Sequence, residues 1–190
     1  AGARRYVARM AATPRSSSTP AMRVVRYAYR IPMLAWHALV HLPLVMLALS
    51  LPLARRPLAS GEPLGHRLTR WWQGGLMRVF GFRLRRIGTP VEGAAMFVAN
   101  HVSWVDILAL HSQRMMGFVA KYEISRWPLV GWMAAKGETI FHRRGSQESL
   151  GGVMEEMQAR LRAGRSVGVF PEGRTRGGDE VGQVETGKRF

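Results

Sequence analysis

The chain has 190 residues, of which 47% are hydrophobic, and this composition excludes a chain that is disordered throughout. It contains no cysteine, which excludes disulfides, thiolate nucleophiles and cysteine-based zinc sites. The formal net charge is +16, from 28 Lys and Arg against 12 Asp and Glu, so we expect a polyanionic partner: an anionic membrane surface, a phosphorylated substrate or nucleic acid.

The N-terminal residues 1–20 contain Arg, Ser and Pro but no acid. Their composition resembles that of a transit peptide, and we interpret them as a mobile arm. Because Arg23, Arg26 and Arg30 follow, we predict a basic N-terminal arm over residues 1–30.

An uncharged apolar run follows at residues 31–53. As a straight helix it would be about 35 Å long, against about 30 Å for the hydrocarbon core of a bilayer. Pro43 interrupts the run near its middle, and basic residues flank both of its ends, which gives no orientation. Three arrangements fit: a full span, a helix that lies in the membrane interface, or a re-entrant pair of short helices bent at Pro43 with both flanks on the cytoplasmic face.

Residues 66–80 have apolar and aromatic side chains at helical spacing, interrupted by Gly74-Gly75. Between Arg55 and Arg86 the only acid among many arginines is Glu62, which favours a surface that faces anionic headgroups. We therefore predict a membrane-associating helical region over residues 31–80, although an ordinary core helix at 66–80 fits as well.

From residue 82 onward short apolar runs alternate with helical stretches. The predicted strands are Phe82–Ile87, Ala95–Ala99, Gly117–Ala120, Thr139–Phe141 and Val167–Phe170. The clearest helix is Gln147–Ala163, with Ser146 as N-cap, Gly164 as C-cap, and an apolar stripe of Leu150, Val153, Met154, Met157 and Leu161. The pattern predicts an α/β domain over residues 81–190, with a mostly parallel mixed sheet flanked by helices and preceded by the membrane-associating helical segment.

A histidine and an aspartate bracket the expected turn between a strand and a helix. The apolar run ends at Asn100, and Ser103 is a candidate N-cap with Asp106 in the capping-box position. This turn would lie at the edge of the sheet where open α/β folds bind ligands. Because the two side chains are five residues apart across the turn, the Asp106 carboxylate could hold one imidazole nitrogen of His101 and leave the other for substrate. A purely structural role also fits, in which Asp106 caps its helix and His101 bonds a backbone carbonyl.

Two further polar loops follow predicted strands in the same way. One is His142-Arg143-Arg144, and the other begins at Pro171-Glu172-Gly173 and continues to Arg176. If the strands are parallel, the three loops open on one edge of the sheet. They would bring together a base, an orienting carboxylate, a guanidinium cluster and a glycine turn.

Three blocks of residues then follow one another along the chain: Asn100-His101-x-x-x-x-Asp106, Gly137-Glu138-Thr139-Ile140-Phe141-His142-Arg143 and Phe170-Pro171-Glu172-Gly173. In this order and at this spacing they resemble the first three blocks of the glycerolipid acyltransferases, typified by 1-acyl-glycerol-3-phosphate acyltransferase. Ala120-Lys121-Tyr122-Glu123 and Trp127-Pro128-Leu129-Val130-Gly131 resemble the same family. The likeness covers about residues 83–173, and the blocks together are far more specific than any one of them.

The resemblance implies a role for each matching residue. His101 would take the proton from a hydroxyl as that hydroxyl attacks an acyl thioester, and Asp106 would orient the imidazole. Arg143 would hold the acceptor phosphate, and Glu172 and Gly173 would shape the acceptor site. Because a thioester is already an activated acyl donor, we expect no enzyme nucleophile, metal or bound cofactor, with acyl-CoA or acyl-carrier protein as co-substrate.

The activity so implied is O-acylation of a lysophospholipid on an anionic membrane surface. The acceptor that best fits the arginines is 1-acyl-glycerol-3-phosphate, which would become phosphatidic acid, and a lyso-ornithine lipid or another lysolipid is an alternative. The resemblance does not separate acyl-CoA from acyl-carrier protein as donor. It implies a location at the cytoplasmic face of a membrane, in a bacterium the inner membrane.

The sequence departs from the family's pattern in two places. The third block of the family usually continues Glu-Gly-Thr-Arg-Ser, whereas here Gly173 is followed by Arg174-Thr175-Arg176. Arg174 and Arg176 are therefore both candidates to meet a phosphate, as is Lys121. The chain ends at Phe190, where the family continues through another helix and a fourth block, so we expect a C-terminally incomplete α/β domain.

Three other functions were weighed against acyl transfer. A zinc hydrolase could use His101, Asp106, His111 and His142, but their spacings lack the i, i+4 pairing of helical zinc sites. A serine hydrolase is disfavoured because Ser103 lacks a G-x-S-x-G context. The charge and the aromatic residues also fit a non-enzymatic basic module that binds nucleic acid or a membrane. The apolar run argues against a nucleic-acid partner.

Overall fold

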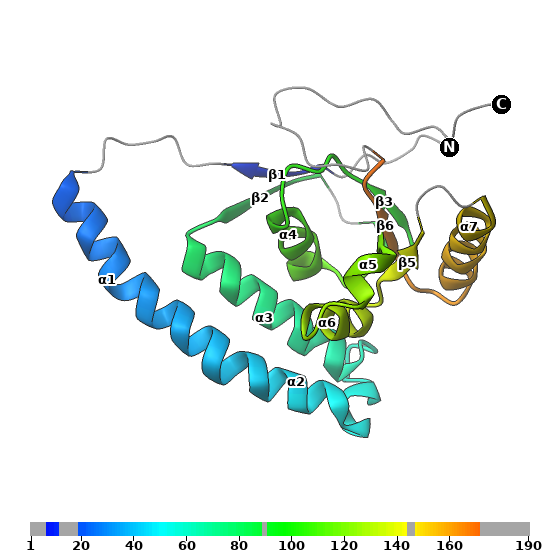
Figure 1. Ribbon diagram of the computed structural model, residues 1–190, viewed down its shortest axis with the longest axis horizontal. Coiled ribbons are helices and arrows are strands. Elements are labelled where there is room, and N and C mark those ends of the chain that lie inside the picture. The colour runs from blue at the N-terminus through cyan, green and yellow to red at the C-terminus, as the bar shows by residue number, and fades with distance from the viewer. Residues whose placement is uncertain (1–6, 12–18, 89–90, 144–146, 172–190) are drawn as a thin grey trace. The chain divides into compact units, whose positions relative to one another are not determined.

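The computed structural model describes residues 7–11, 19–88, 91–143 and 147–171 (Figure 1). The chain divides into two compact units. Unit 1 falls within residues 1–90 and 107–114, and unit 2 within residues 91–106 and 115–190. Helices dominate unit 1, and strands alternate with helices in unit 2, so the predicted α/β fold with a preceding helical segment is confirmed.

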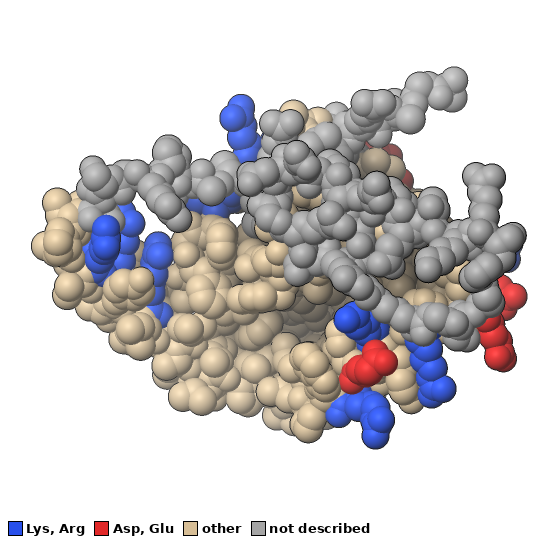
Figure 2. Space-filling view, turned by 45° about the horizontal axis from the view of Figure 1, so that its top comes forward, with Lys and Arg blue, Asp and Glu red and all other residues tan. Residues whose placement is uncertain are grey.

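A single long helix opens unit 1. It consists of three consecutive segments: α1 (Pro20–Trp36), the π-helical turn η1 (His37–His41) and α2 (Leu42–Ser50). With 31 residues, it is the one helix of the described chain that is long and apolar enough to cross a membrane. Its exposed side chains include Trp36, Leu39, Leu44 and Leu47. Figure 2 shows a mostly uncharged surface over α1 and α2, with basic side chains near the start of α1.

Of the arrangements that the sequence left open, the re-entrant pair bent at Pro43 is wrong, because the helix continues through this proline. Proline has no N–H, and inside a helix it normally removes a hydrogen bond and kinks the chain. Here the π-turn comes immediately before it: the Leu42 N–H donates to the His37 carbonyl, and Pro43 falls in the first turn of α2. In a first turn the missing N–H costs little, so one continuous helix results.

The third helix, α3 (Leu64–Phe80), follows the short 3-10 helix η2 (Pro52–Arg55) and packs against α1 and α2 (Figure 1). The predicted helix over residues 66–80 is thereby confirmed. The packing is closest at His37, whose Nε2 lies 2.8 Å from the Trp72 carbonyl oxygen and whose ring stacks on the Trp72 ring at 5.3 Å. Trp72, Leu76, Met77 and Val79 are buried on this face of α3.

The two adjacent glycines of α3 should respond in opposite ways to alanine. A Cβ at Gly75 would lie 2.6 Å from Cε1 of the buried His37, whereas a Cβ at Gly74 would meet nothing closer than Ser112 Cβ at 3.6 Å. We expect Gly75→Ala to lower the free energy of unfolding by about 1–2 kcal/mol through overpacking. Gly74→Ala should raise it by up to about 1 kcal/mol through helix propensity. Denaturant unfolding in detergent measures both, and equal stabilities would contradict this packing.

A separate two-stranded ribbon belongs to unit 1. β1 (Val7–Ala11) pairs antiparallel with β2 (Arg83–Ile87), with Met10 opposite Leu84. The predicted strand at residues 82–87 is present, but it lies in this ribbon and not in the parallel sheet. The expectation of a mobile arm is wrong for residues 7–11, because they form a strand that pairs with β2. The sequence near β1 does not show this pairing, since the partner strand lies far along the chain.

Unit 2 is built on a four-stranded parallel sheet. Its strands are β3 (Met96–Val98), β4 (Gly117–Lys121), β5 (Ile140–His142) and β6 (Val167–Val169). Their order across the sheet is β3-β6-β4-β5, and every neighbouring pair is parallel. Four of the five predicted strands are therefore confirmed as one parallel sheet.

The helices that follow these strands are α4 (Val105–Gln113), α5 (Tyr122–Ser125), α6 (Val130–Lys136) and α7 (Gln147–Arg162). The predicted helix at residues 147–163 is confirmed, and Gly164 ends it with φ +76°. Its predicted apolar stripe is partly wrong, because Leu150 and Met154 are exposed. Arg160 is buried instead: its Nη1 donates to the Glu138 carbonyl, which turns that side of the helix toward the sheet. Ser146, the predicted N-cap, lies outside the described residues.

Candidate active site

Asp106 closes the turn between β3 and α4. Its Oδ2 accepts hydrogen bonds from the N–H groups of Val102 (2.7 Å) and Ser103 (2.8 Å). Ser103 Oγ in turn accepts from the Val105 N–H at 3.1 Å. The predicted cap is therefore present, and Asp106 supplies the carboxylate that reaches back to the capping residue.

The same carboxylate oxygen also holds His101. The distance from His101 Nδ1 to Asp106 Oδ2 is 3.2 Å, and the side chains are only 20% and 11% exposed. The capping role and the orienting role of Asp106 are thus served by one atom. With a proton on Nδ1 directed at the carboxylate, Nε2 on the far side of the ring is the basic nitrogen.

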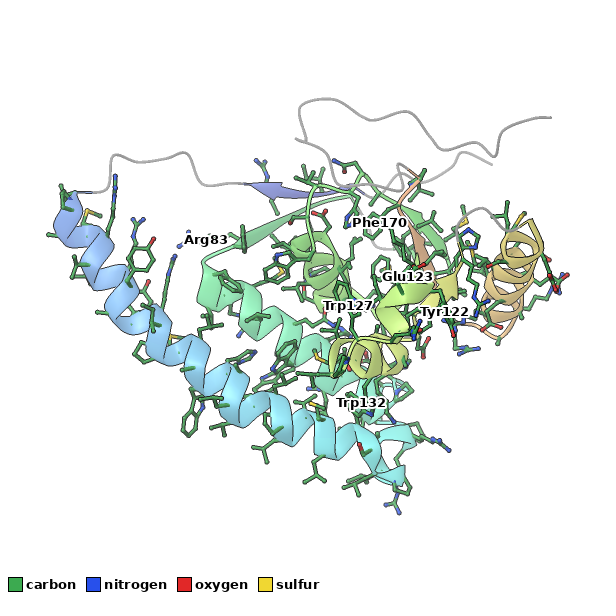
Figure 3. The ribbon with its side chains drawn as sticks, viewed as in Figure 1. Arg83, Tyr122, Glu123, Trp127, Trp132 and Phe170 are labelled. Carbon is green, nitrogen blue, oxygen red and sulfur yellow. The ribbon has the colours of Figure 1, made fainter. Side chains whose placement is uncertain are left out.

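An aromatic stack supports the imidazole. The ring of His101 lies 4.2 Å from the ring of Phe170, at an interplanar angle of 23°, and Phe170 stacks on Phe118 at 5.2 Å and 8°. Gly168 makes room for this stack, because a Cβ there would lie 2.5 Å from Phe118 Cε1. Figure 3 labels Phe170, which follows β6 directly. We assigned no role to either phenylalanine from the sequence; the place of Phe170 at the head of the third block was the available signal.

Arg143 lies at the end of β5. Its guanidinium sits 4.3 Å from the centre of the Tyr122 ring, a residue that Figure 3 labels on α5. Its backbone N–H donates to Ser149 Oγ at 2.9 Å, and the same hydroxyl lies 2.9 Å from His142 Nδ1. Ser149 belongs to α7, so this helix and the Tyr122 ring together position the exposed cation.

The parallel strands bring the predicted loops to one edge of the sheet. In the order of the strands, the residues at their carboxyl ends are His101, Phe170, Lys121 and Arg143. Strands lie about 4.8 Å apart, so β3 and β5 are about 14 Å apart. The edge carries the His101 imidazole at one end and the exposed cations of Lys121 and Arg143 toward the other. Glu172, Gly173, Arg174 and Arg176 lie outside the described residues.

The zinc alternative draws no geometric support from the described part of the chain. No group of three or more His, Asp or Glu side chains there is arranged to hold a metal ion. His111, which that alternative requires, is buried, and its Nδ1 lies 3.0 Å from Nε2 of Gln73.

Comparison with known proteins assigns the chain to a family. The family model described as Acyltransferase matches residues 67–189. The chain belongs to the Acyltransferase family. The resemblance inferred from the three blocks is thereby confirmed, and all three blocks lie within the matched residues.

Relatives of this chain include two kinds of lipid enzyme. A lyso-ornithine lipid O-acyltransferase of Pseudomonas aeruginosa is 40% identical over 127 residues, which are 67% of this chain and 49% of the relative. A 1-acyl-sn-glycerol-3-phosphate acyltransferase of Neisseria gonorrhoeae is 34% identical over 98 residues, which are 52% of this chain and 38% of the relative. The chain thus spans about half the length, or less, of the curated relatives it matches.

The fold of this chain matches a solved structure. The 1-acyl-sn-glycerophosphate (LPA) acyltransferase PlsC of Thermotoga maritima superposes with a TM-score of 0.59 and 20% sequence identity. The match covers 86% of this chain and 68% of that chain. It shows that the fold is shared.

Proposed function

We propose that the chain carries the transfer machinery of a lysolipid O-acyltransferase, which moves a fatty acyl group from acyl-CoA or acyl-carrier protein to a free hydroxyl. The observation that carries this proposal is the His101–Asp106 pair, hydrogen-bonded at 3.2 Å at the carboxyl edge of the sheet. The membership of the chain in the Acyltransferase family gives that pair its reaction class.

In the proposed mechanism His101 acts as a general base. Nε2 accepts the proton of the acceptor hydroxyl while its oxygen attacks the thioester carbonyl carbon, and Asp106 stabilises the imidazolium that forms. Collapse of the tetrahedral intermediate breaks the carbon–sulfur bond, and the imidazolium returns the proton to the departing thiolate. The products are an ester of the lysolipid and a free thiol, with no acyl group held on the protein.

For the acceptor we propose a lyso-ornithine lipid, because the relative of that name matches a larger share of this chain at higher identity. The second candidate is 1-acyl-glycerol-3-phosphate. Exposed Lys121 and Arg143, at the same edge of the sheet as His101, favour it because guanidinium and ammonium groups bind phosphate strongly. Both acceptor lipids contain an acyl chain, an anionic group and a free hydroxyl.

The test is an acyl-transfer assay on membranes that contain the full chain. Each acceptor is offered with acyl-CoA and with acyl-carrier protein, and the lipid product is detected by mass spectrometry. We expect an acylated lysolipid and a stoichiometric free thiol, with turnover highest on the lyso-ornithine lipid. Turnover only on 1-acyl-glycerol-3-phosphate would move the acceptor assignment to the second candidate. Hydrolysis of the thioester without any acylated lipid would contradict the function.

We expect Arg143 to contribute to binding of the acceptor lipid and not to the acyl-transfer step. Replacing it by alanine removes a charged contact to the acceptor headgroup, so KM for the acceptor should rise about tenfold while kcat changes little. Arg143→Lys should recover part of the loss, and Arg162→Ala, an exposed arginine of α7, serves as the matched control. Steady-state kinetics with varied acceptor measure these effects. A fall in kcat at unchanged KM would contradict the binding role.

A further inference from the structure

Unit 1 contains a cavity of about 550 Å³ that includes no residue placed at the candidate active site. It is bounded by α3, by β2 and by the last turn of α4. Arg67, Arg70 and Arg78 of α3 line it together with Arg86 of β2. A volume of this order is typical of sites for small molecules and headgroups.

Among the residues that the structure describes, the positive charge of this cavity is mostly uncompensated. Nη1 of Arg70 bonds both carboxylate oxygens of Glu62, at 2.9 and 3.0 Å, and Glu62 is the one acid among the described lining residues. No ion pair joins Arg67, Arg78 or Arg86 to any acid in the described chain. Three guanidinium groups around one cavity favour an anion, and their planar donors match the oxygens of a phosphate.

Apolar side chains also line the cavity, together with the polar Ser112 and Gln113 of α4. The apolar side chains include Trp71, Met77, Phe82 and Leu84. The Trp71 ring also contacts two rings of the long helix, at 6.2 Å from His37 and 5.0 Å from His41. The cavity therefore borders the helix whose length and composition suit a membrane, and tryptophan is a residue that membrane interfaces favour. A ligand here would meet cations and, at Trp71, a residue in contact with the helix that is long and apolar enough to cross a membrane.

We propose that this cavity binds the phosphate headgroup of an anionic membrane phospholipid that is not a substrate. Arg67, Arg78 and Arg86 hold the phosphate, and the acyl chains leave past Trp71 along the exposed side chains of α1 and α2. A lipid fits better than a soluble phosphate compound because the cavity has apolar side chains beside its arginines and because Trp71, one of them, contacts the long apolar helix. Bound lipid of this kind anchors unit 1 in the headgroup layer.

The test measures binding of short-chain phosphatidylglycerol and phosphatidylcholine to the full chain in neutral detergent, by isothermal titration calorimetry. Detergent removes the surface potential of a bilayer, so only a specific site distinguishes the two lipids. We expect phosphatidylglycerol to bind at least about tenfold more tightly. The triple variant Arg67→Gln/Arg78→Gln/Arg86→Gln should abolish this preference, and Arg86→Gln alone, at an exposed position on β2, should reduce it several-fold.

The matched control is Arg55→Gln/Arg56→Gln/Arg83→Gln, which removes the same charge from unit 1 outside the cavity lining. It should keep the preference. Equal affinity for the two lipids, or an equal loss in the control, would overturn the proposal. Displacement of the bound lipid by CoA or by the acceptor lysolipid would assign the cavity to a substrate and overturn it too. Inorganic phosphate that binds as tightly as the lipid would show a site for free phosphate instead.

Discussion

Replacing His101 by alanine is expected to lower kcat for acyl transfer by about 10²–10⁴-fold, the range that a positioned general base contributes. The imidazole is held by Asp106 and stacked on Phe170, so its removal takes away the proton acceptor without disturbing the buried core below it. The acylated lipid formed per minute, at saturating thioester and lysolipid, measures the effect.

Two variants separate this catalytic role from a structural one. His101→Gln keeps a polar side chain of similar reach but offers no base, so it should lose as much activity as the alanine variant. His66→Ala, a histidine of α3 outside the described site, should keep the wild-type rate. A His101→Gln enzyme with near wild-type turnover would contradict general-base catalysis.

Replacing Asp106 should damage both stability and activity, because one oxygen serves three donors. In Asp106→Ala the N–H groups of Val102 and Ser103 lose their partner, at a cost of about 1–3 kcal/mol for each group that stays unsatisfied. His101 also loses the charge that stabilises its protonated form, so we expect kcat to fall by about 10²–10³-fold. Thermal unfolding and turnover measure the two effects.

The Asp106→Asn variant separates the loss of stability from the loss of activity. An amide oxygen in place of Oδ2 still accepts from both backbone N–H groups, so most of the stability should return. Its neutral dipole cannot stabilise an imidazolium as a carboxylate does, so activity should stay well below the wild-type rate. If the asparagine variant recovers stability and activity together, Asp106 only shapes the turn.

The parallel sheet could be predicted because its strands are short apolar runs, and each run is followed by a polar loop. Residues 95–99 and 167–170 are two such runs, and the strands that they form, β3 and β6, begin and end within one residue of the expected bounds. The order β3-β6-β4-β5 could not be predicted, since it depends on pairing between strands distant in sequence. Strand β1 could not be predicted for the same reason, because its partner β2 begins only at Arg83, far along the chain.

The His101–Asp106 pair could be predicted from the local turn, because capping and orientation both act within a few residues. The Phe118–Phe170 stack beneath the imidazole could not, because it joins side chains of two strands through the space that Gly168 leaves. The sequence could not choose between a continuous long helix and a bent pair for a local reason: a proline favours a break, and the hydrogen bonds of a π-turn are not visible in the sequence.

The most direct test of the account is a rapid-quench experiment with a labelled acyl thioester and a lysolipid acceptor. If His101 activates the acceptor hydroxyl directly, the label passes straight from the thioester to the lipid, no labelled protein forms at any time, and His101→Ala slows the transfer by about 10²–10⁴-fold. A labelled protein that forms and decays at the rate of turnover would mean a covalent acyl-enzyme, and it would contradict direct activation of the acceptor hydroxyl by His101.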